Sequence, residues 1–193
     1  RAIVSSLSLN LTVLILLFCS IYKTNAEIGD FNYTVARRKI KYVEEFYAQY
    51  KLKMHYDTEN SLANIHWLEY ALLAPFDHPI RAMALIRTEK EHLKYKRVFK
   101  MRIHFLIMKS YLMLGRRYDK ENIYFFNLEY KRELLAGFQI ARMYYLRAKE
   151  HWNMVVKWAQ SAWELKHIHV IGAELDKMQN EMFFVVTKDK WHN

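Results

Sequence analysis

The sequence predicts an all-α fold made of antiparallel helical hairpins. Its 193 residues include only four glycines and two prolines, too few for the tight turns that a sheet of this size requires. Apolar residues over 134–163 recur at steps of three and four, the period of one amphipathic helix or of two helices in line. Aromatic side chains make up 16% of the chain, and half-buried tyrosine rings fit well between packed helices.

Residues 134–163 alternate small and large side chains along their apolar stripe. The small residues allow two helices to approach closely, and the aromatic rings fill the spaces between them. We expect the tightest of these contacts at Ala141, Tyr145, Ala148 and Trp152. We also expect a break near 151–154 that divides the segment into a helix pair, although no glycine or proline marks it. The pattern is one of packing and contains no reaction chemistry.

Helix-stop signals divide the rest of the chain. Pro75 ends a helix over 59–74, because proline cannot continue the hydrogen-bond ladder. No breaker follows Pro79 until Gly115, so 79–117 is one long helix or two helices in series. Gly172 separates the preceding helix from the last one. In chain order, the predicted helices outside 134–163 cover 33–56, 59–74, 79–117, 121–132 and 173–186.

The first 26 residues predict export. Residues 3–22 are largely apolar, and the small residues of 24–26 offer a cleavage site. A cleaved signal peptide, an uncleaved membrane anchor and a lipid-modified Cys19 are the three readings, and all of them place the remainder outside the cytoplasm. Cys19 is the only cysteine. The exported part would therefore form no internal disulfide, which fits a bacterial periplasm.

The net charge of +10 favours acidic partners or an anionic membrane face. The densest basic cluster is interleaved with Tyr95 and Phe99, which superficially suggests nucleic acid. A helix with one core face and one solvated face explains this spacing more simply, and export argues against nucleic acid. Two tryptophans near the edge of the 134–163 stripe could anchor a partner. We therefore predict a partner-binding surface at Trp158, Trp163, Lys94, Lys96, Arg97, Lys100 and Arg102.

One constellation could hold metal. Glu89 with His92, and Glu164 with His167, show the Glu-x2-His spacing that places both side chains on one helix face in di-iron bundles. Roughly one such pair arises by chance in a chain of this composition. Glu89 and His92 also lie in a lysine-rich stretch that is typical of a solvated surface. We therefore assign no catalytic, cofactor-binding or metal-binding residue, expect no cofactor, and predict that the protein is not an enzyme.

Several motifs resemble tetratricopeptide repeats (TPR). Ala63, Trp67 and Tyr70 followed by Pro75 are similar to the second helix of a repeat. The Leu-Gly-x2-Tyr of residues 114–118 resembles a first helix, and residues 141–162 show the same alternation of alanine and aromatic residues. The resemblance implies a TPR-like α-solenoid over 27–187. Its helix-packing positions would be Ala63, Trp67, Tyr70, Leu114, Gly115, Tyr118, Ala141, Tyr145, Ala148 and Trp152.

A narrower resemblance points to one setting. The runs at 74–79, 106–112 and 144–152 look similar to small exported repeat proteins of the spirochaete periplasmic flagellar motor collar. That resemblance implies a structural role among other collar proteins. Cell-envelope or flagellar motor components would be the partners.

The sequence thus predicts an exported, non-enzymatic helical scaffold for protein–protein assembly. Its segments would be a signal peptide or anchor at 1–26, the helical domain at 27–187 and a polar tail at 188–193. The location would be the periplasm or the periplasmic face of the inner membrane, with attachment through 3–22. Two alternatives remain open: a ferritin-like di-iron bundle, and a basic helical protein that binds a membrane surface or nucleic acid.

Overall fold

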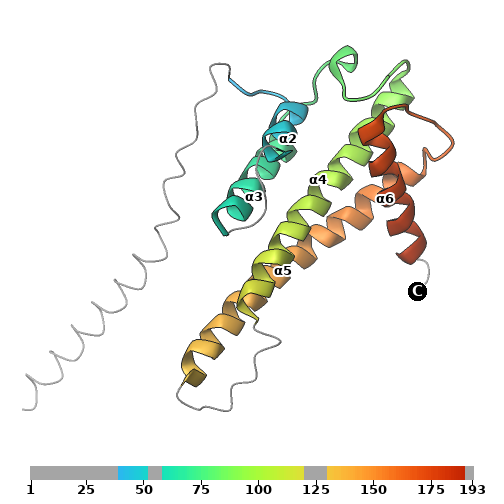
Figure 1. Cartoon of the computed structure of the whole chain (residues 1–193). Coiled ribbons are helices and arrows are strands. Elements are labelled where there is room, and N and C mark those ends of the chain that lie inside the picture. Colours follow the sequence, from blue (N-terminus) through green and yellow to red (C-terminus); the bar gives the residue numbers. More distant parts are fainter. Residues whose placement is uncertain (1–38, 52–57, 120–129, 190–193) are drawn as a thin grey trace, which may run out of the picture. The chain divides into compact units, whose positions relative to one another are not determined.

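A computed structural model of the protein describes residues 39–51, 58–119 and 130–189. These ranges form α-helices and one short 3-10 helix, whose labels follow Figure 1. An isolated bridge between Leu85 and Ile171 is the sole β-type pairing in them. The all-α prediction is confirmed. The elements are α2 (Val43–Lys51), α3 (Thr58–Leu73), η1 (Pro79–Arg81), α4 (Glu89–Tyr118), α5 (Lys131–Trp163) and α6 (Ala173–Asp189).

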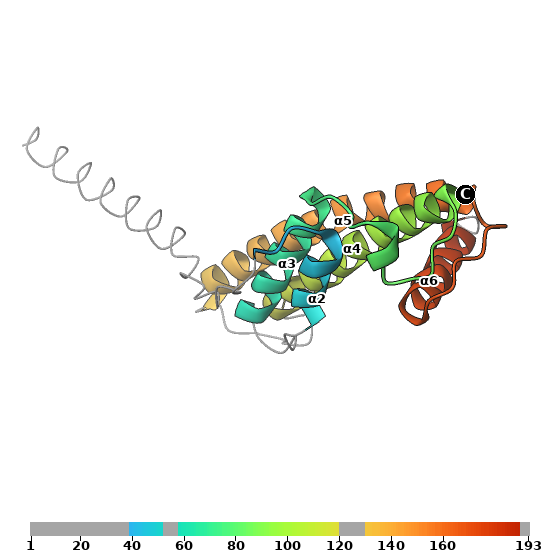
Figure 2. The same ribbon diagram turned by 90° about the horizontal axis from the view of Figure 1, so that it is seen from above.

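Helix α4 is the centre of the packing. It lies antiparallel beside α5 over most of its length, and it also packs against α3 and α6 (Figures 1 and 2). Helix α2 packs on α3, and α6 packs on α5 as well as on α4. Because α4 is covered from several sides, it buries residues on more than one of its faces. The fully buried side chains include Tyr47 of α2, Leu68 of α3, Phe99 and Ile107 of α4, Val155 of α5 and Met178 of α6.

Helix α5 runs unbroken for 33 residues through 151–154. The expected break and the helix pair over 134–163 are therefore wrong. Buried alanines and valine continue along one stripe on both sides of the expected break, from Ala141 to Ala162. Helix α4, which is 30 residues long, offers a continuous surface for that stripe. Since neither glycine nor proline occurs at 151–154, nothing in the local sequence ends the helix there.

Helix α4 begins at Glu89 and not at 79, so the prediction for 79–117 is too long at its start. Thr88 and Glu91 form a reciprocal capping box: Glu91 N donates to Thr88 Oγ1, and Thr88 N donates to the Glu91 carboxylate. Two of the free N–H groups at this helix end are thereby satisfied. After η1, the chain stays extended or bent up to Thr88, and Leu85 N donates to Ile171 O at 2.8 Å within this stretch.

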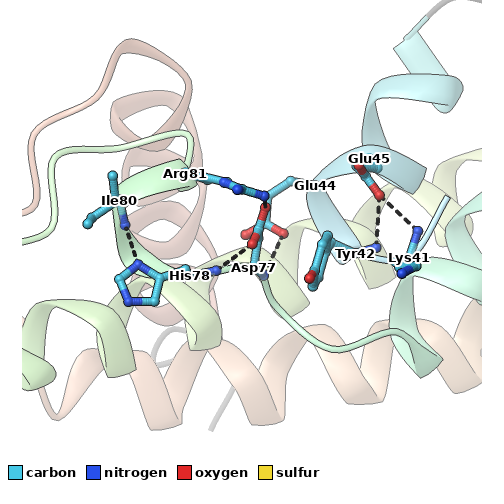
Figure 3. A network of polar contacts seen from close by, with 8 residues as sticks. All are labelled: Lys41, Tyr42, Glu44, Glu45, Asp77, His78, Ile80 and Arg81. Carbon is cyan, nitrogen blue, oxygen red and sulfur yellow. Dashed lines mark hydrogen bonds and ion pairs between the residues drawn. The ribbon is translucent and has the colours of Figure 1, made fainter. Parts of the chain in front are cut away.

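The first predicted helix, over 33–56, is wrong at 39–42. Residues 39–42 are not helical, and α2 starts at Val43. One carboxylate oxygen of Glu45 accepts hydrogen bonds from Lys41 N at 2.8 Å and Tyr42 N at 3.2 Å, which caps this end (Figure 3). The remaining parts of that prediction, 33–38 and 52–56, lie outside the described residues.

The predictions for 59–74 and 173–186 agree closely with α3 and α6. Helix α6 continues to Asp189, two residues into the expected polar tail. Most of the predicted helix over 121–132 and the segment at 1–26 lie outside the described residues. No helix in the described ranges is long and apolar enough to cross a bilayer.

A carboxylate network fixes the segment between α3 and α4. Glu44 is buried, and its two oxygens accept from Tyr95 Oη at 2.9 Å and from Asp77 N at 3.2 Å. Asp77 in turn accepts from His78 N and pairs with Arg81 at 3.8 Å (Figure 3). The network joins α2, the loop before η1 and α4. It therefore stabilises the fold. The surface described next is formed mainly by α5 and α6, which the residues of this network do not belong to.

Candidate protein-binding groove

A groove of about 710 Å³ lies between α4, α5 and α6. Phe105 comes from α4, Trp152 from α5, and the remaining lining residues come from α6. Aromatic and aliphatic side chains dominate its surface, with a few polar groups at the edge, as is typical of binding clefts. The α6 residues that line it are Asn180, Glu181, Phe184, Val185 and Lys188.

Helix α6 forms this groove because it carries apolar residues on two faces. One face buries Leu175, Met178 and Met182 against the rest of the protein. Phe183 and Phe184 lie outside that face, and each is 56% exposed. Both rings stay more than half exposed, although the next two residues of the same helix, Val185 and Val186, are buried. The exposed rings therefore mark a surface that a partner could cover.

Lysine side chains lie over the aromatic rings of this region. Lys109 Nζ is 4.8 Å from the centroid of the Phe105 ring, and Lys188 Nζ is 4.8 Å from that of Phe184. Outside the groove, Lys100 lies over Trp158 at 4.9 Å and Lys166 over Trp163 at 5.1 Å. The lysine stems cover apolar surface while the ammonium groups reach solvent. The groove thus combines an aromatic floor with a positive edge.

The acidic residue of the groove is already paired. The Glu181 carboxylate accepts from Arg102, which reaches it from α4. Arg102 also interacts with Tyr47, and Tyr47 Oη donates to Glu174 Oε1 at 3.0 Å. Because this pair neutralises Glu181, the positive charge of Lys188 and Lys109 dominates the edge.

One residue of the predicted basic cluster, Lys94, is buried, and the other four are half-buried. Lys94 is only 3% exposed, and its Nζ donates to Ile168 O at 2.5 Å. Burial lowers the pKa of the Lys94 ammonium. Arg97 donates to Ser161 O at 2.5 Å and to the Glu164 carboxylate at 2.9 Å. Together with Arg102, these side chains join α4 to α5, to α6 and to the turn between them. Lys96 and Lys100 are half-buried.

The two predicted anchor tryptophans are half-buried and do not line the groove. Trp163 packs on Phe183 with ring centroids 5.9 Å apart. Trp163 and Phe183 also line a separate depression of about 540 Å³, with Lys94, Lys166 and His169 among its other residues. The Nε1 atom of Trp158 is buried without a hydrogen-bond acceptor.

The predicted packing residues lie at the helix contacts with one exception. Gly115 of α4 faces Tyr145 of α5 so closely that a Cβ atom on Gly115 would lie 2.4 Å from the ring. Tyr145 Oη also donates to the carboxylate of Asp119. Tyr70 is the exception, because it is 46% exposed and stacks on Phe46 at the surface. Ala63, Leu114, Gly115, Ala141 and Ala148 are buried, and Trp67, Tyr118, Tyr145 and Trp152 are half-buried.

The residues considered for metal binding do not form a cluster. Glu164 pairs with Arg97, His167 is exposed, and Glu89 is exposed at the start of α4. Over 39–51, 58–119 and 130–189, no three His, Cys, Asp or Glu side chains are close enough to hold one ion.

Two other histidines do meet. The Nδ1 atoms of His104 on α4 and His151 on α5 are 3.0 Å apart, although the residues are 47 positions apart in sequence. Burial, aided by His151 and Lys100, lowers the pKa of His104 to about 4. Burial also lowers the pKa of His151. A neutral pair in which one ring donates to the other fits this site.

These features define an all-helical protein whose candidate site is a groove between α4, α5 and α6. Residues 90–190, slightly more than half of the chain, match the family described as Domain of unknown function (DUF8513), and the chain belongs to this family. The matched residues cover α4 from its second residue, α5 and α6, and so include every residue that lines the groove. No curated protein and no solved structure matches the chain.

Most groove residues were missed by the sequence analysis. The sequence predicts Trp152 as a packing residue, whereas it does not single out Phe184 or Lys188. The adjacent phenylalanines at 183–184 are the signal that could have found the site, because they extend the apolar part of the last helix beyond the stripe of Leu175, Met178 and Met182.

Proposed function

We propose that this protein is a non-enzymatic helical scaffold that binds another protein through the groove between α4, α5 and α6. The occupant would be an amphipathic helix with apolar residues on one face and acidic residues beside them. The observation that carries the proposal is the aromatic groove with exposed Phe184, edged by Lys109 and Lys188.

Three physical arguments support this choice of partner. An apolar groove between helices is the usual seat for the apolar face of another helix. Large aromatic side chains such as Trp152 and Phe184 supply much of the binding energy where they become fully desolvated. The lysines at the edge favour acidic residues, which would steer association and make it sensitive to salt.

The setting of the scaffold is part of the same proposal. The apolar segment at 3–22 supports export, and the repeat motifs support a TPR-like arrangement of the helices. The resemblance to motor collar proteins supports partners in the cell envelope or the flagellar motor. Attachment to the inner membrane would come from the same N-terminal segment.

Affinity capture from native membranes, with quantitative mass spectrometry, tests the proposal. Full-length wild type would be compared with Phe184→Ala and with Leu73→Ala, a matched control at a side chain that is 83% exposed on α3. A specific partner should fall by roughly tenfold with Phe184→Ala, which corresponds to about 1.4 kcal/mol. Leu73→Ala should retain it.

Synthetic peptides then test the partner chemistry. A helix from the captured protein should bind wild type, and replacing its acidic residues by glutamine should weaken binding. Equal capture by wild type and Phe184→Ala would overturn the groove as the binding site. Capture that survives unchanged in high salt would overturn the acidic character of the partner.

A further inference from the structure

Helix α5 carries a second apolar stripe on the face that points away from α4. We name it the outer α5 stripe and define it by Leu135, Phe138, Met143 and Leu146. Each of these residues is 46% to 52% exposed. The buried alanines Ala141 and Ala148 mark the opposite face of the helix. Shallow depressions of about 480 and 380 Å³ flank Arg142 and Leu146 within the stripe. The outer α5 stripe is separate from the groove, which begins at Trp152.

The stripe is symmetrical about its own centre. Leu135 and Leu146 are eleven residues apart, about three helical turns, and so lie on one line along the helix. Phe138 and Met143 lie on opposite edges of this line. Phe138 is three residues after Leu135, and Met143 is three residues before Leu146. If the helix is turned end for end about the point between residues 140 and 141, Leu135 takes the place of Leu146 and Phe138 takes the place of Met143.

We propose that the outer α5 stripe is the interface with a second copy of this chain, in an antiparallel helix pair with a two-fold axis between residues 140 and 141. A two-fold interface requires a self-complementary surface, and Leu135 and Leu146, at equal distances from the centre of the stripe, supply its matching apolar ends. Leu135 then lies opposite Leu146 of the second copy, at each end of the apolar contact. The middle of the interface places Gln139 opposite Arg142 of the second copy.

The polar side chains of the stripe favour this direction. On one edge, Arg142 comes beside Phe138 of the second copy, where a guanidinium and an aromatic ring attract. On the other edge, Arg132 comes beside Glu150 of the second copy, and both are exposed in one chain. A parallel pair would instead place Arg142 beside Arg142 of the second copy and Glu150 beside Glu150 of the second copy. The repulsion between these like charges costs energy.

One contact opposes association. Lys131 and Lys149 of the second copy meet on the Phe138 edge, at the ends of the interface where solvent and salt screen them. Salt screens this repulsion and the attraction between Arg132 and Glu150 alike. The two proposals are therefore told apart by position: Phe184→Ala tests the groove, and variants at Leu135 and Leu146 test the outer α5 stripe.

Disulfide cross-linking of the full chain tests the arrangement. Cys19, the only native cysteine, is replaced by serine, and Leu135→Cys and Leu146→Cys are made separately in that background. In the antiparallel pair, residue 135 lies opposite residue 146, whereas two copies of residue 135 are about 16 Å apart along the helices. A disulfide needs Cα atoms within about 7 Å. Mixing the two variants should give roughly ten times more cross-linked dimer than either variant alone.

Two outcomes would overturn the proposal. Equal cross-linking of each variant with itself would indicate a parallel pair. No cross-linking in the mixture above that of a Leu73→Cys control would show that the stripe does not meet a second copy. Light scattering on a Leu135→Arg, Leu146→Arg double variant provides the second measurement. A monomer with unchanged helical circular dichroism is expected, and a persistent dimer would also contradict the proposal.

Discussion

His104 and His151 face each other across the α4–α5 contact, with their Nδ1 atoms 3.0 Å apart. A hydrogen bond between two imidazoles requires one ring to donate and the other to accept, so the pair is stable when both rings are neutral. Tyr111 lies next to His151, with ring centroids 5.8 Å apart, and also stacks on Tyr144. Protonation of both histidines would place two positive charges between the longest helices of the described structure.

The stability of the fold should therefore depend on pH. Burial lowers the pKa of His104 to about 4 from an ordinary value of 6.5. The unfolded chain takes up the proton first, so stability is complete above pH 6.5 and falls as the pH drops toward 4. The loss should reach up to about 3 kcal/mol. Urea unfolding of wild type and His104→Gln at several pH values between 4 and 7.5 measures it.

His104→Gln should show a shallower fall of stability over this range than wild type. The exposed His167 provides a control, and His167→Gln should follow the wild-type curve. Identical curves for wild type and His104→Gln would contradict a neutral buried pair.

Gly115→Ala should destabilise the protein by about 1–3 kcal/mol. A methyl group there would lie 2.4 Å from the Tyr145 ring, and moving the ring also disturbs its hydrogen bond to Asp119. In a Tyr145→Ala background the clash is absent. The same Gly115→Ala change should then stabilise the helix by up to about 1 kcal/mol, because alanine is the better helix former. Thermal unfolding of the four proteins tests this change of sign.

Substitutions at Arg102 and Lys188 should have different effects. The first should lower the stability of the fold, and the second should weaken binding of the groove partner. Arg102→Gln leaves the carboxylate of Glu181 without its partner in a partly buried site, and should cost about 1–3 kcal/mol of stability. Lys188 is exposed at the edge of the groove. Lys188→Gln should change stability by less than about 0.5 kcal/mol and weaken capture of the groove partner. A stable Arg102→Gln protein would show that the Glu181 pair contributes little to the fold.

Glu44 should hold the segment between α3 and α4 in place. Glu44→Ala removes the acceptors of Tyr95 Oη and Asp77 N, and should cost about 2–3 kcal/mol. Limited proteolysis should then cut within 77–88 faster than in wild type, since this segment lacks a helix beyond η1. Glu45→Ala, which removes the cap of α2, should leave that cleavage rate unchanged.

The helix around Ala63 could be predicted from the sequence, whereas the burial of Lys94 could not. The helical period around Ala63, ended by Pro75, predicts α3 nearly to the residue because both signals are local. Lys94 belongs to an equally clear pattern, yet a lysine in a helix gives no local indication of burial. Its position opposite the Ile168 carbonyl depends on how α4 packs on the turn after α5. Charge alone therefore gives no indication that Lys94 is buried and hydrogen-bonded inside the protein.

The sequence by itself determined that this protein is helical, because the scarcity of glycine and proline and the helical period act within one turn of the chain. It also determined where α3 and α6 begin. Only the tertiary structure decided that α5 continues through 151–154, since the long surface of α4 supports it there. The contact between His104 and His151, and the groove that Phe105 and Phe184 both line, likewise depend on the packing of separate helices, which no local pattern specifies.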